Sequence, residues 1–269
     1  MRDTNDVHQT RRLVLAGLAT TSFAAACASE GNAIIDQRQT FTIGARPGPI
    51  AIEPRSSAVI VVDMQNDFGS AGGMFDLAGI NITGIQAAVA PTSRVLAAAR
   101  AAGIRIIYLK MAFRPDLSDL GAADSVNRAR HMRLNVGKSV RAPDGRESGI
   151  LIRDTWNSDI VSELTPHAGD IVIYKTRFSG FYKTDLDETL KRFGVRHLIV
   201  TGCTTSICVE STVRDAMFRD YLPVLLADCM SEPIGDGMSR SNHEASLLSV
   251  ETLLGWVTTS DRLLSALSS

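Results

Sequence analysis

Short runs of apolar residues alternate along the chain with longer segments in which apolar residues recur every three or four positions. The short runs are continuous and rich in β-branched side chains, a pattern typical of parallel strands that are buried on both faces of a sheet. They predict five strands, at residues 58–62, 104–109, 171–174, 198–201 and 223–227.

The longer segments predict the helices between these strands. Gly103 follows one of them and Gly194 closes another, and both fit the glycine that commonly ends a helix. Helices are expected at residues 85–102, 160–164 and 184–194, from residue 208 onward, and at 243–256. Strands and helices in this alternation indicate an α/β fold: a three-layer, doubly wound parallel sheet with helices on both faces.

Composition limits the classes of protein that fit. The 269 residues suffice for one substantial domain and are few for two. The formal net charge is -1 and no long basic segment occurs, so no nucleic-acid partner is expected. No apolar stretch reaches the roughly 20 residues that a membrane-spanning helix needs.

The first 27 residues resemble an export signal. Arg11 and Arg12 precede an uncharged stretch of small and apolar residues at 13–26, which ends at Cys27. This order describes a secretory signal peptide, and the paired arginines suggest the twin-arginine route. The last residues also resemble a lipoprotein cleavage box, which would anchor the mature protein to the membrane through a lipidated Cys27. Cleavage by an ordinary signal peptidase near Ala26 is the competing interpretation.

The sequence therefore divides into three predicted parts. Residues 1–27 are the signal peptide, residues 28–56 a linker and an N-terminal arm, and residues 57–269 the folded domain. The protein is expected to be exported, either as a periplasmic protein or as a membrane-anchored lipoprotein. A cytoplasmic protein with an N-terminal extension is the alternative.

Polar residues gather at the predicted carboxyl ends of the strands. Asp63, Lys110, Lys175 and Asp228 end or follow a strand, and so does the segment 202–208. Ligand sites of open parallel sheets form beside these ends. An aspartate, a lysine and a cysteine that meet there supply the base, cation and nucleophile of covalent acyl transfer. Taken singly, each also fits a structural role: a turn aspartate, a solvated lysine, a small buried cysteine.

Cys208 is the candidate nucleophile. It lies where the strand at 198–201 turns into a helix, at or near the helix N-terminus. The unpaired N–H groups and the positive end of the helix dipole favour a negative charge there. We therefore expect the pKa of this thiol to lie below its ordinary value of about 8.5. Cys203 and Cys229 fit the role of inert buried residues.

Three segments resemble the signature segments of the isochorismatase-like cysteine hydrolases: VVDMQNDF at 61–68, DIVIYK at 170–175 and TGCTTSICV at 201–209. The resemblance extends over residues 57–267. Within this superfamily the chain is most similar to the ureidoacrylate amidohydrolases, through the segments 175–181, 208–215 and 250–257. The segment 114–120 resembles the biuret hydrolases.

This resemblance implies a catalytic triad of Asp63, Lys175 and Cys208. It also implies a cis peptide bond before Thr204 and an oxyanion hole formed by the backbone N–H groups of Thr204 and Cys208. The activity it implies is the cleavage of a C–N bond in a small linear amide, ureido or carbamoyl compound, through a thioester on Cys208. Members are commonly oligomers, so a homo-oligomer is expected.

Neither a cofactor nor a metal is expected. In metal-dependent relatives, the nicotinamidases, a histidine stands two residues after the aspartate, where this chain has Gln65. The five histidines are scattered and show no spacing typical of zinc ligands. The sequence therefore predicts a metal-independent enzyme.

Three residues are candidates for substrate binding: Asn127, Arg177 and Phe178. An asparagine can donate to and accept from an amide, and Arg177, like Arg128 and Arg130, could pair with a carboxylate. The chain departs from the ureidoacrylate amidohydrolases at Phe178, where a tyrosine is expected. It also has an export leader that they lack. The resemblance therefore leaves the particular substrate open.

Two other functions remain open. The first is vinyl ether hydrolysis of the isochorismatase type, which uses the aspartate and the lysine without a thiol. The second is a non-enzymatic, redox-sensing envelope protein in which Cys203 and Cys208 form a disulfide.

Overall fold

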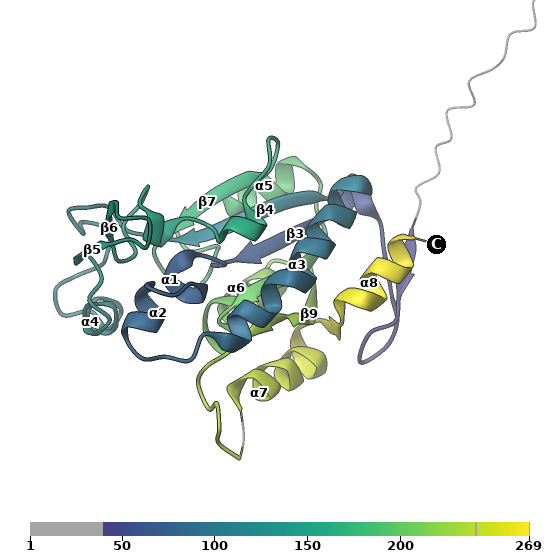
Figure 1. The fold of residues 1–269 in the computed structure, drawn as a ribbon. Helices are drawn as coiled ribbons and strands as arrows, with labels where there is room; N and C mark the ends of the chain where they lie inside the picture. The colour runs from purple at the N-terminus through teal and green to yellow at the C-terminus, as the bar shows by residue number, and fades with distance from the viewer. Residues whose placement is uncertain (1–39, 240, 269) are drawn as a thin grey trace, which may run out of the picture. The chain divides into compact units, whose positions relative to one another are not determined.

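The computed structural model describes residues 40–239 and 241–268, and a six-stranded parallel sheet runs through them (Figure 1). Its strand order is β10-β9-β8-β3-β4-β7, and every neighbouring pair is parallel. The strands are β3 (Ser57–Val62), β4 (Arg105–Met111), β7 (Ile171–Lys175), β8 (His197–Cys203), β9 (Leu222–Ser231) and β10 (Trp256–Thr258). The predicted α/β class with a doubly wound parallel sheet is confirmed.

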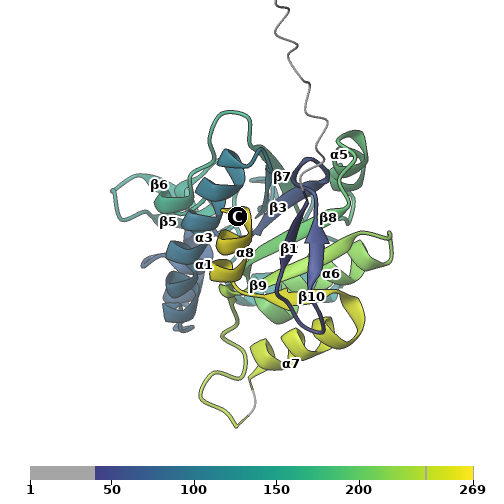
Figure 2. The same ribbon diagram turned by 90° about the vertical axis from the view of Figure 1, so that its right-hand side faces the viewer.

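Helices cover both faces of the sheet. The long α3 (Thr83–Ala101) and α8 (Ser260–Leu267) lie on one face, while α5 (Leu186–Arg192) and α6 (Glu210–Met217) lie on the other (Figures 1 and 2). The central strands are the most deeply buried: all six residues of β3 are buried, as are six of the seven residues of β8. This burial on both faces explains why the strands read as continuous apolar runs.

The edge strand β10 was not predicted. The apolar spacing at 243–256 predicts one helix, but the structure has α7 (Asn242–Ser249), a π-helical turn at Val250–Leu254, and then β10. A Cβ atom at Gly255 would lie 2.3 Å from the carbonyl oxygen of Pro223 in β9. Gly255 therefore lets the chain leave the helix and approach the sheet closely enough to add a strand.

Several short elements were also missed. They are α1 (Asn66–Gly69), α2 (Met74–Leu77), α4 (Val126–Arg133) and the hairpin β5 (Ser139–Arg141) with β6 (Glu147–Gly149). The short helix predicted at 160–164 is a single 3-10 turn at Ser162–Leu164, with Ile160 in a β-bridge to Gln65. Two further 3-10 turns lie at Pro54–Ser56 and Trp156–Ser158. Segments this short carry too few apolar positions to show a period.

The described part of the predicted arm forms a hairpin of β1 (Phe41–Ile43) and β2 (Ile50–Ile52). Ile43 and Ile52 are fully buried, and Arg46 forms a bridge to Val257 in the edge strand β10. The packed structure therefore begins before residue 57. The predicted signal peptide and Cys27 lie outside the described residues.

The strand order brings the ends of β3 and β8 side by side. Gly202 in β8 has φ +117°, and a Cβ atom there would come 2.0 Å from the carbonyl oxygen of Val62 at the end of β3. Only glycine fits this close approach of two backbones. The segment that carries Cys208 follows directly, so the candidate nucleophile lies beside the residue that ends β3.

Candidate active site

Asp63, Lys175 and Cys208 meet at the carboxyl edge of the sheet. Asp63 directly follows β3, Lys175 is the last residue of β7, and Cys208 lies in a π-helical turn (Thr205–Val209) between β8 and α6. Nζ of Lys175 lies 2.7 Å from Oδ2 of Asp63. The strand β4 lies between β3 and β7, so the ion pair joins two strands that are not neighbours in the sheet.

Asp63 is fixed on every side. Its backbone has φ +51°, in the left-handed region that aspartate tolerates better than most residues. Its Oδ1 accepts a hydrogen bond of 3.0 Å from the N–H of Met111, and its own N–H donates to the carbonyl of Leu109. The carboxylate is therefore held by the end of β4 and by Lys175.

Asp63 and Lys175 are both buried, with 0% and 1% of their surface exposed. Burial raises the pKa of Asp63, and this effect outweighs the charge of Lys175 and the interaction with the Cys208 thiol, which both lower it. For Lys175, burial lowers the pKa, but the charges of Asp63 and Cys208 outweigh it, so the pKa is raised. The raised pKa of Lys175 favours its ammonium form, and the raised pKa of Asp63 makes its carboxylate a better proton acceptor.

The pKa of the Cys208 thiol is raised, whereas the sequence predicts that it is lowered. Burial raises its pKa, and the neighbouring Asp63 raises it further, against the opposing charge of Lys175. The predicted lowering by a helix N-terminus is outweighed because the side chain is only 7% exposed. The resting thiol is protonated, and its natural proton acceptor is the Asp63 carboxylate beside it.

The turn that carries Cys208 is fastened to two neighbouring elements. The N–H and the Oγ of Ser206 donate to Oε2 of Glu232, at 2.8 and 2.5 Å, and Thr205 Oγ1 lies 2.9 Å from Nδ1 of His243. Glu232 is buried directly after β9, and His243 is in α7. The sequence analysis did not single out either residue.

The backbone around Thr204 also takes an unusual course. The peptide bond between Cys203 and Thr204 is cis, as the resemblance implies. The carbonyl of Thr204 then accepts hydrogen bonds of 3.2 Å from the N–H groups of Ile207 and Val209. Thr204 and Cys208 line the same cavity as Asp63.

This Cys208 cavity has a volume of about 590 Å³, within the range of roughly 300–1,000 Å³ that holds small molecules. Most of the residues that line it are apolar. It is lined by Asp63, Phe68, Met74, Phe75, Met111, Val126, Arg130, His131, Leu134, Leu151, Phe178, Cys203, Thr204, Ser206, Ile207, Cys208, Ser211 and Ile234.

Of the three candidate substrate-binding residues, only Phe178 lines the cavity, where its ring stacks on His131 at 6.0 Å. Asn127 instead donates to the carbonyl of Leu120. Arg177 donates to the carbonyls of Asp119 and Thr176 and lines a separate surface pocket.

The placement of Asn127 and Arg177 in the substrate pocket is therefore corrected. Both side chains supply hydrogen bonds to loop carbonyls that have no strand partner. Arg128 does the same for the carbonyls of Leu117 and Gly121, and Arg130 is the arginine of this group that reaches the cavity.

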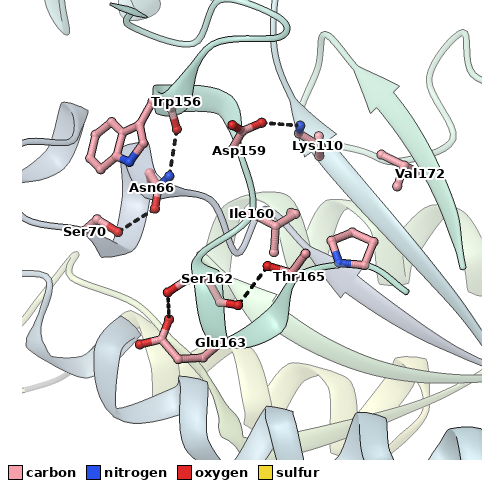
Figure 3. Close-up of a pocket in the computed structure, with 11 residues that line it drawn as sticks. Asn66, Ser70, Lys110, Trp156, Asp159, Ile160, Ser162, Glu163, Thr165 and Val172 are labelled. Atoms are coloured by element: carbon pink, nitrogen blue, oxygen red, sulfur yellow. Dashed lines mark hydrogen bonds and ion pairs between the residues drawn. The ribbon is translucent and has the colours of Figure 1, made fainter. Parts of the chain in front are cut away.

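Two polar residues at strand ends face away from the site. Lys110 lies 3.5 Å from Asp159 and lines a different pocket of about 540 Å³, together with Asn66 and Trp156 (Figure 3). Successive side chains of a strand point to opposite faces, so Met111 enters the Cys208 cavity and Lys110 does not. Asp228 accepts the N–H of Ser260 at the start of α8.

Gln65 is occupied by the backbone. Its Nε2 donates to the carbonyls of Met111 and Ser158, and its Oε1 accepts the N–H of Met111 at 2.8 Å. Within residues 40–239 and 241–268, no group of three or more histidine, cysteine or acidic side chains is arranged to hold a metal ion.

The cysteines of the described part of the chain, Cys203, Cys208 and Cys229, are free thiols. The Sγ atom of Cys203 contacts the backbone oxygen of Asp63 at 3.2 Å. In the same part of the chain no helix is both long and apolar enough to cross a bilayer.

Comparison with known proteins shows the family of the chain. Residues 57–262 match the isochorismatase domain family. The chain is 41% identical over 217 residues to the ureidoacrylate amidohydrolase RutB of Variovorax paradoxus, covering 81% of this chain and 83% of that protein. It is 39% identical over 229 residues to RutB of Serratia proteamaculans, covering 85% and 90%.

A solved cysteine hydrolase from Pseudomonas syringae pv. phaseolicola has the same fold, with a TM-score of 0.67 and 31% identity over 81% of this chain and 94% of that one. The chain belongs to the isochorismatase family. It is a hydrolase that acts on carbon–nitrogen bonds other than peptide bonds.

Proposed function

We propose that the protein is a metal-independent cysteine amidohydrolase that cleaves a C–N bond in a small linear amide, ureido or carbamoyl compound. The observation that carries the proposal is the pairing of Asp63 with Lys175 at 2.7 Å, buried beside the Cys208 thiol at the base of one cavity. This pairing supports the roles of base for Asp63, cation for Lys175 and nucleophile for Cys208.

The first half of the reaction forms a thioester. Asp63 takes the thiol proton of Cys208 while the sulfur attacks the carbonyl carbon of the substrate. The N–H groups of Thr204 and Cys208 stabilise the oxyanion, an interaction of which each donor is worth about a hundredfold in rate. Asp63 then gives its proton to the departing nitrogen, the C–N bond breaks, and ammonia or an amine leaves.

The second half consumes one water. Asp63 takes a proton from the water, whose oxygen attacks the thioester carbon. The C–S bond breaks, the acid product leaves, and the proton returns from Asp63 to the sulfur. Asp63 thus alternates between base and acid, which a carboxyl with a raised pKa does well near neutral pH. Lys175 holds the carboxylate in place and offsets the negative charge of each intermediate.

The metal-free mechanism is supported by Gln65, whose side chain forms three hydrogen bonds to the backbone of Met111 and Ser158. A side chain so engaged is part of the scaffold and has no free ligand atom. We expect full activity after exhaustive treatment with a chelator, whereas loss of activity that added metal restores would contradict this part of the proposal.

The test of the nucleophile is Cys208→Ala. It is expected to abolish ammonia release from amide and carbamoyl compounds, while circular dichroism and the urea midpoint stay near those of the wild type. Cys229→Ala is the matched control, because Cys229 is a buried thiol in β9 outside the cavity. Activity that survives Cys208→Ala would contradict the proposal.

The two other functions predict different results. Vinyl ether hydrolysis needs no thiol, so turnover would survive alkylation of Cys208. A redox-sensing protein would carry a Cys203–Cys208 disulfide as its main form in the oxidising envelope, which mass spectrometry of the purified protein would detect. We expect inactivation by alkylation and free thiols.

Location and assembly are proposed from the sequence alone. We propose export through the leader at 1–27, supported by Arg11, Arg12 and the apolar stretch at 13–26. Cell fractionation separates a periplasmic protein from one anchored through Cys27 and from a cytoplasmic one. We propose a homo-oligomer by analogy with the family, to be measured by light scattering after size-exclusion chromatography.

A further inference from the structure

We propose that the substrate carries an apolar substituent, of the size of a phenyl ring or a branched alkyl chain, on its amide or carbamoyl group. The inference rests on the proposed function and concerns the part of the Cys208 cavity that lies beyond the triad. A polar substrate such as a short ureido acid would leave most of this wall in contact with water.

One wall of the cavity is an aromatic and aliphatic cluster. Phe68 and Phe75 pack edge to face, with ring centroids 5.0 Å apart, and Met74 is buried beside them. These residues come from α1 and α2, which directly follow the end of β3 and Asp63. The cavity lining also includes Leu134 and Ile207, which are half-buried. A flat or branched apolar group is the chemistry that these residues would bind.

Two polar side chains near Cys208 are engaged elsewhere. Ser206 donates from its N–H and its Oγ to Glu232, and Lys175 is paired with Asp63. Arg130 lines the cavity but is exposed, so a carboxylate that paired with it would gain little in water. A carboxylate buried deeper would have no cation of its own among the lining residues, which is unfavourable.

His131 adds an aromatic surface without a positive charge. Its Nδ1 lies 2.7 Å from the backbone oxygen of Asn127, an atom that only accepts, so Nδ1 carries the proton of the neutral ring. Burial is the main reason that the pKa of His131 is lowered. Its ring packs against Phe113 and Phe178. The residue therefore presents a neutral aromatic wall to the ligand.

The test compares matched substrates by their kcat/KM for ammonia release. N-carbamoylphenylalanine is paired with N-carbamoylglycine, and 3-phenylpropionamide with acetamide. In each pair the apolar member is expected to be at least about 30-fold better, the gain from burying one phenyl-sized group. Equal or reversed preference, with release still dependent on Cys208, would overturn this inference and leave the proposed function intact.

A binding measurement separates the two proposals if no compound is turned over. Absence of Cys208-dependent release from every compound counts against the proposed function. Calorimetry then compares 3-phenylpropionamide with acetamide on the full-length protein. Tighter binding of the phenyl compound supports the apolar pocket, and equal binding overturns it.

A substitution among the residues that line the Cys208 cavity tests whether they cause the preference for apolar substrates. Leu134→Asn places an amide on a half-buried position of the cavity and is expected to lower kcat/KM for the apolar member of each pair about tenfold, with little change for the polar member. Leu248→Asn is the control, since Leu248 is 58% exposed on α7 and does not line the cavity. An equal effect of both variants, or none of Leu134→Asn, would contradict the assignment.

Discussion

Nζ of Lys175 lies 2.7 Å from Oδ2 of Asp63, with less than 2% of either side chain exposed. An ion pair of this kind gains its Coulomb energy in a region of low dielectric constant but loses the hydration of both charges. Its value to the enzyme therefore lies less in stability than in keeping a charged base and a cation in fixed positions beside the Cys208 thiol.

Removal of one partner should be costly. Lys175→Met leaves the Asp63 carboxylate buried without its cation, and we expect a loss of about 3–5 kcal/mol in the free energy of unfolding. The double variant Asp63→Asn with Lys175→Met removes both charges and should lose much less than the sum of the single variants. Urea unfolding measures all three. Additive losses would contradict the direct pairing.

The pH dependence of alkylation tests the state of the thiol. Because burial raises the pKa of Cys208, the thiolate fraction stays small at neutral pH and grows only in the alkaline range. The rate of alkylation by iodoacetamide, followed by mass spectrometry of the Cys208 peptide, should keep rising above about pH 9. A plateau near pH 7 would instead restore the helix-dipole interpretation of the sequence.

Glu232 is expected to position the nucleophile. Its carboxylate accepts two hydrogen bonds from Ser206, two residues before Cys208, and one from the N–H of Ile234. Glu232→Gln replaces one oxygen by a donor, so at least one of these bonds is lost. We expect kcat to fall about tenfold while KM changes little, since Glu232 does not line the Cys208 cavity.

The control for that variant is Glu163→Gln, because Glu163 is exposed in the 3-10 turn at Ser162–Leu164. It should leave both kinetic constants unchanged. A purely structural role of Glu232 would show as a lower urea midpoint with an unaltered kcat at low temperature, and that outcome would contradict the positioning role.

The sequence predicted the parts of the site that depend on strand ends. Asp63, Lys175 and Cys208 each follow or end an apolar run, and the carboxyl ends of parallel strands meet at one edge whatever the details of packing. Glu232 and His243 were not predicted, because their roles arise from contacts with residues 26 and 38 positions away along the chain. No local sequence pattern indicates such contacts.

Residue type alone does not predict the role of a side chain where burial or local hydrogen-bond partners determine it. Asn127 and Arg177 have the right chemistry for a substrate, but nearby loop carbonyls already use their donors. The pKa of Cys208 was expected to fall because the turn into a helix is visible in the sequence, whereas the depth of burial is not. The edge strand β10 was hidden by apolar spacing that continues the preceding helix.

Asp67 provides a prediction on stability. This fully buried carboxylate accepts hydrogen bonds from the N–H groups of Met74 and Leu151 and from Nδ2 of Asn157, at 2.9, 2.6 and 2.5 Å. Burial nevertheless outweighs these three donors and raises the pKa of Asp67 to about 6. Through these hydrogen bonds the Asp67 side chain links α1 to α2 and to the segment at 151–157. The burial of its charge lowers the free energy of unfolding.

That cost should appear in the pH dependence of unfolding. In the unfolded chain the pKa of Asp67 returns to about 3.9, so between about pH 4 and 6 the folded state binds more protons than the unfolded state. The free energy of unfolding therefore falls as the pH rises through this window, by about 3 kcal/mol from this group, and the contribution is constant above about pH 7. Urea midpoints at about pH 4.5 and 7.5 should show a steeper fall for the wild type than for Asp67→Asn. The exposed Asp124→Asn should follow the wild type, and parallel pH profiles of the wild type and Asp67→Asn would show that the three donors fully offset the burial.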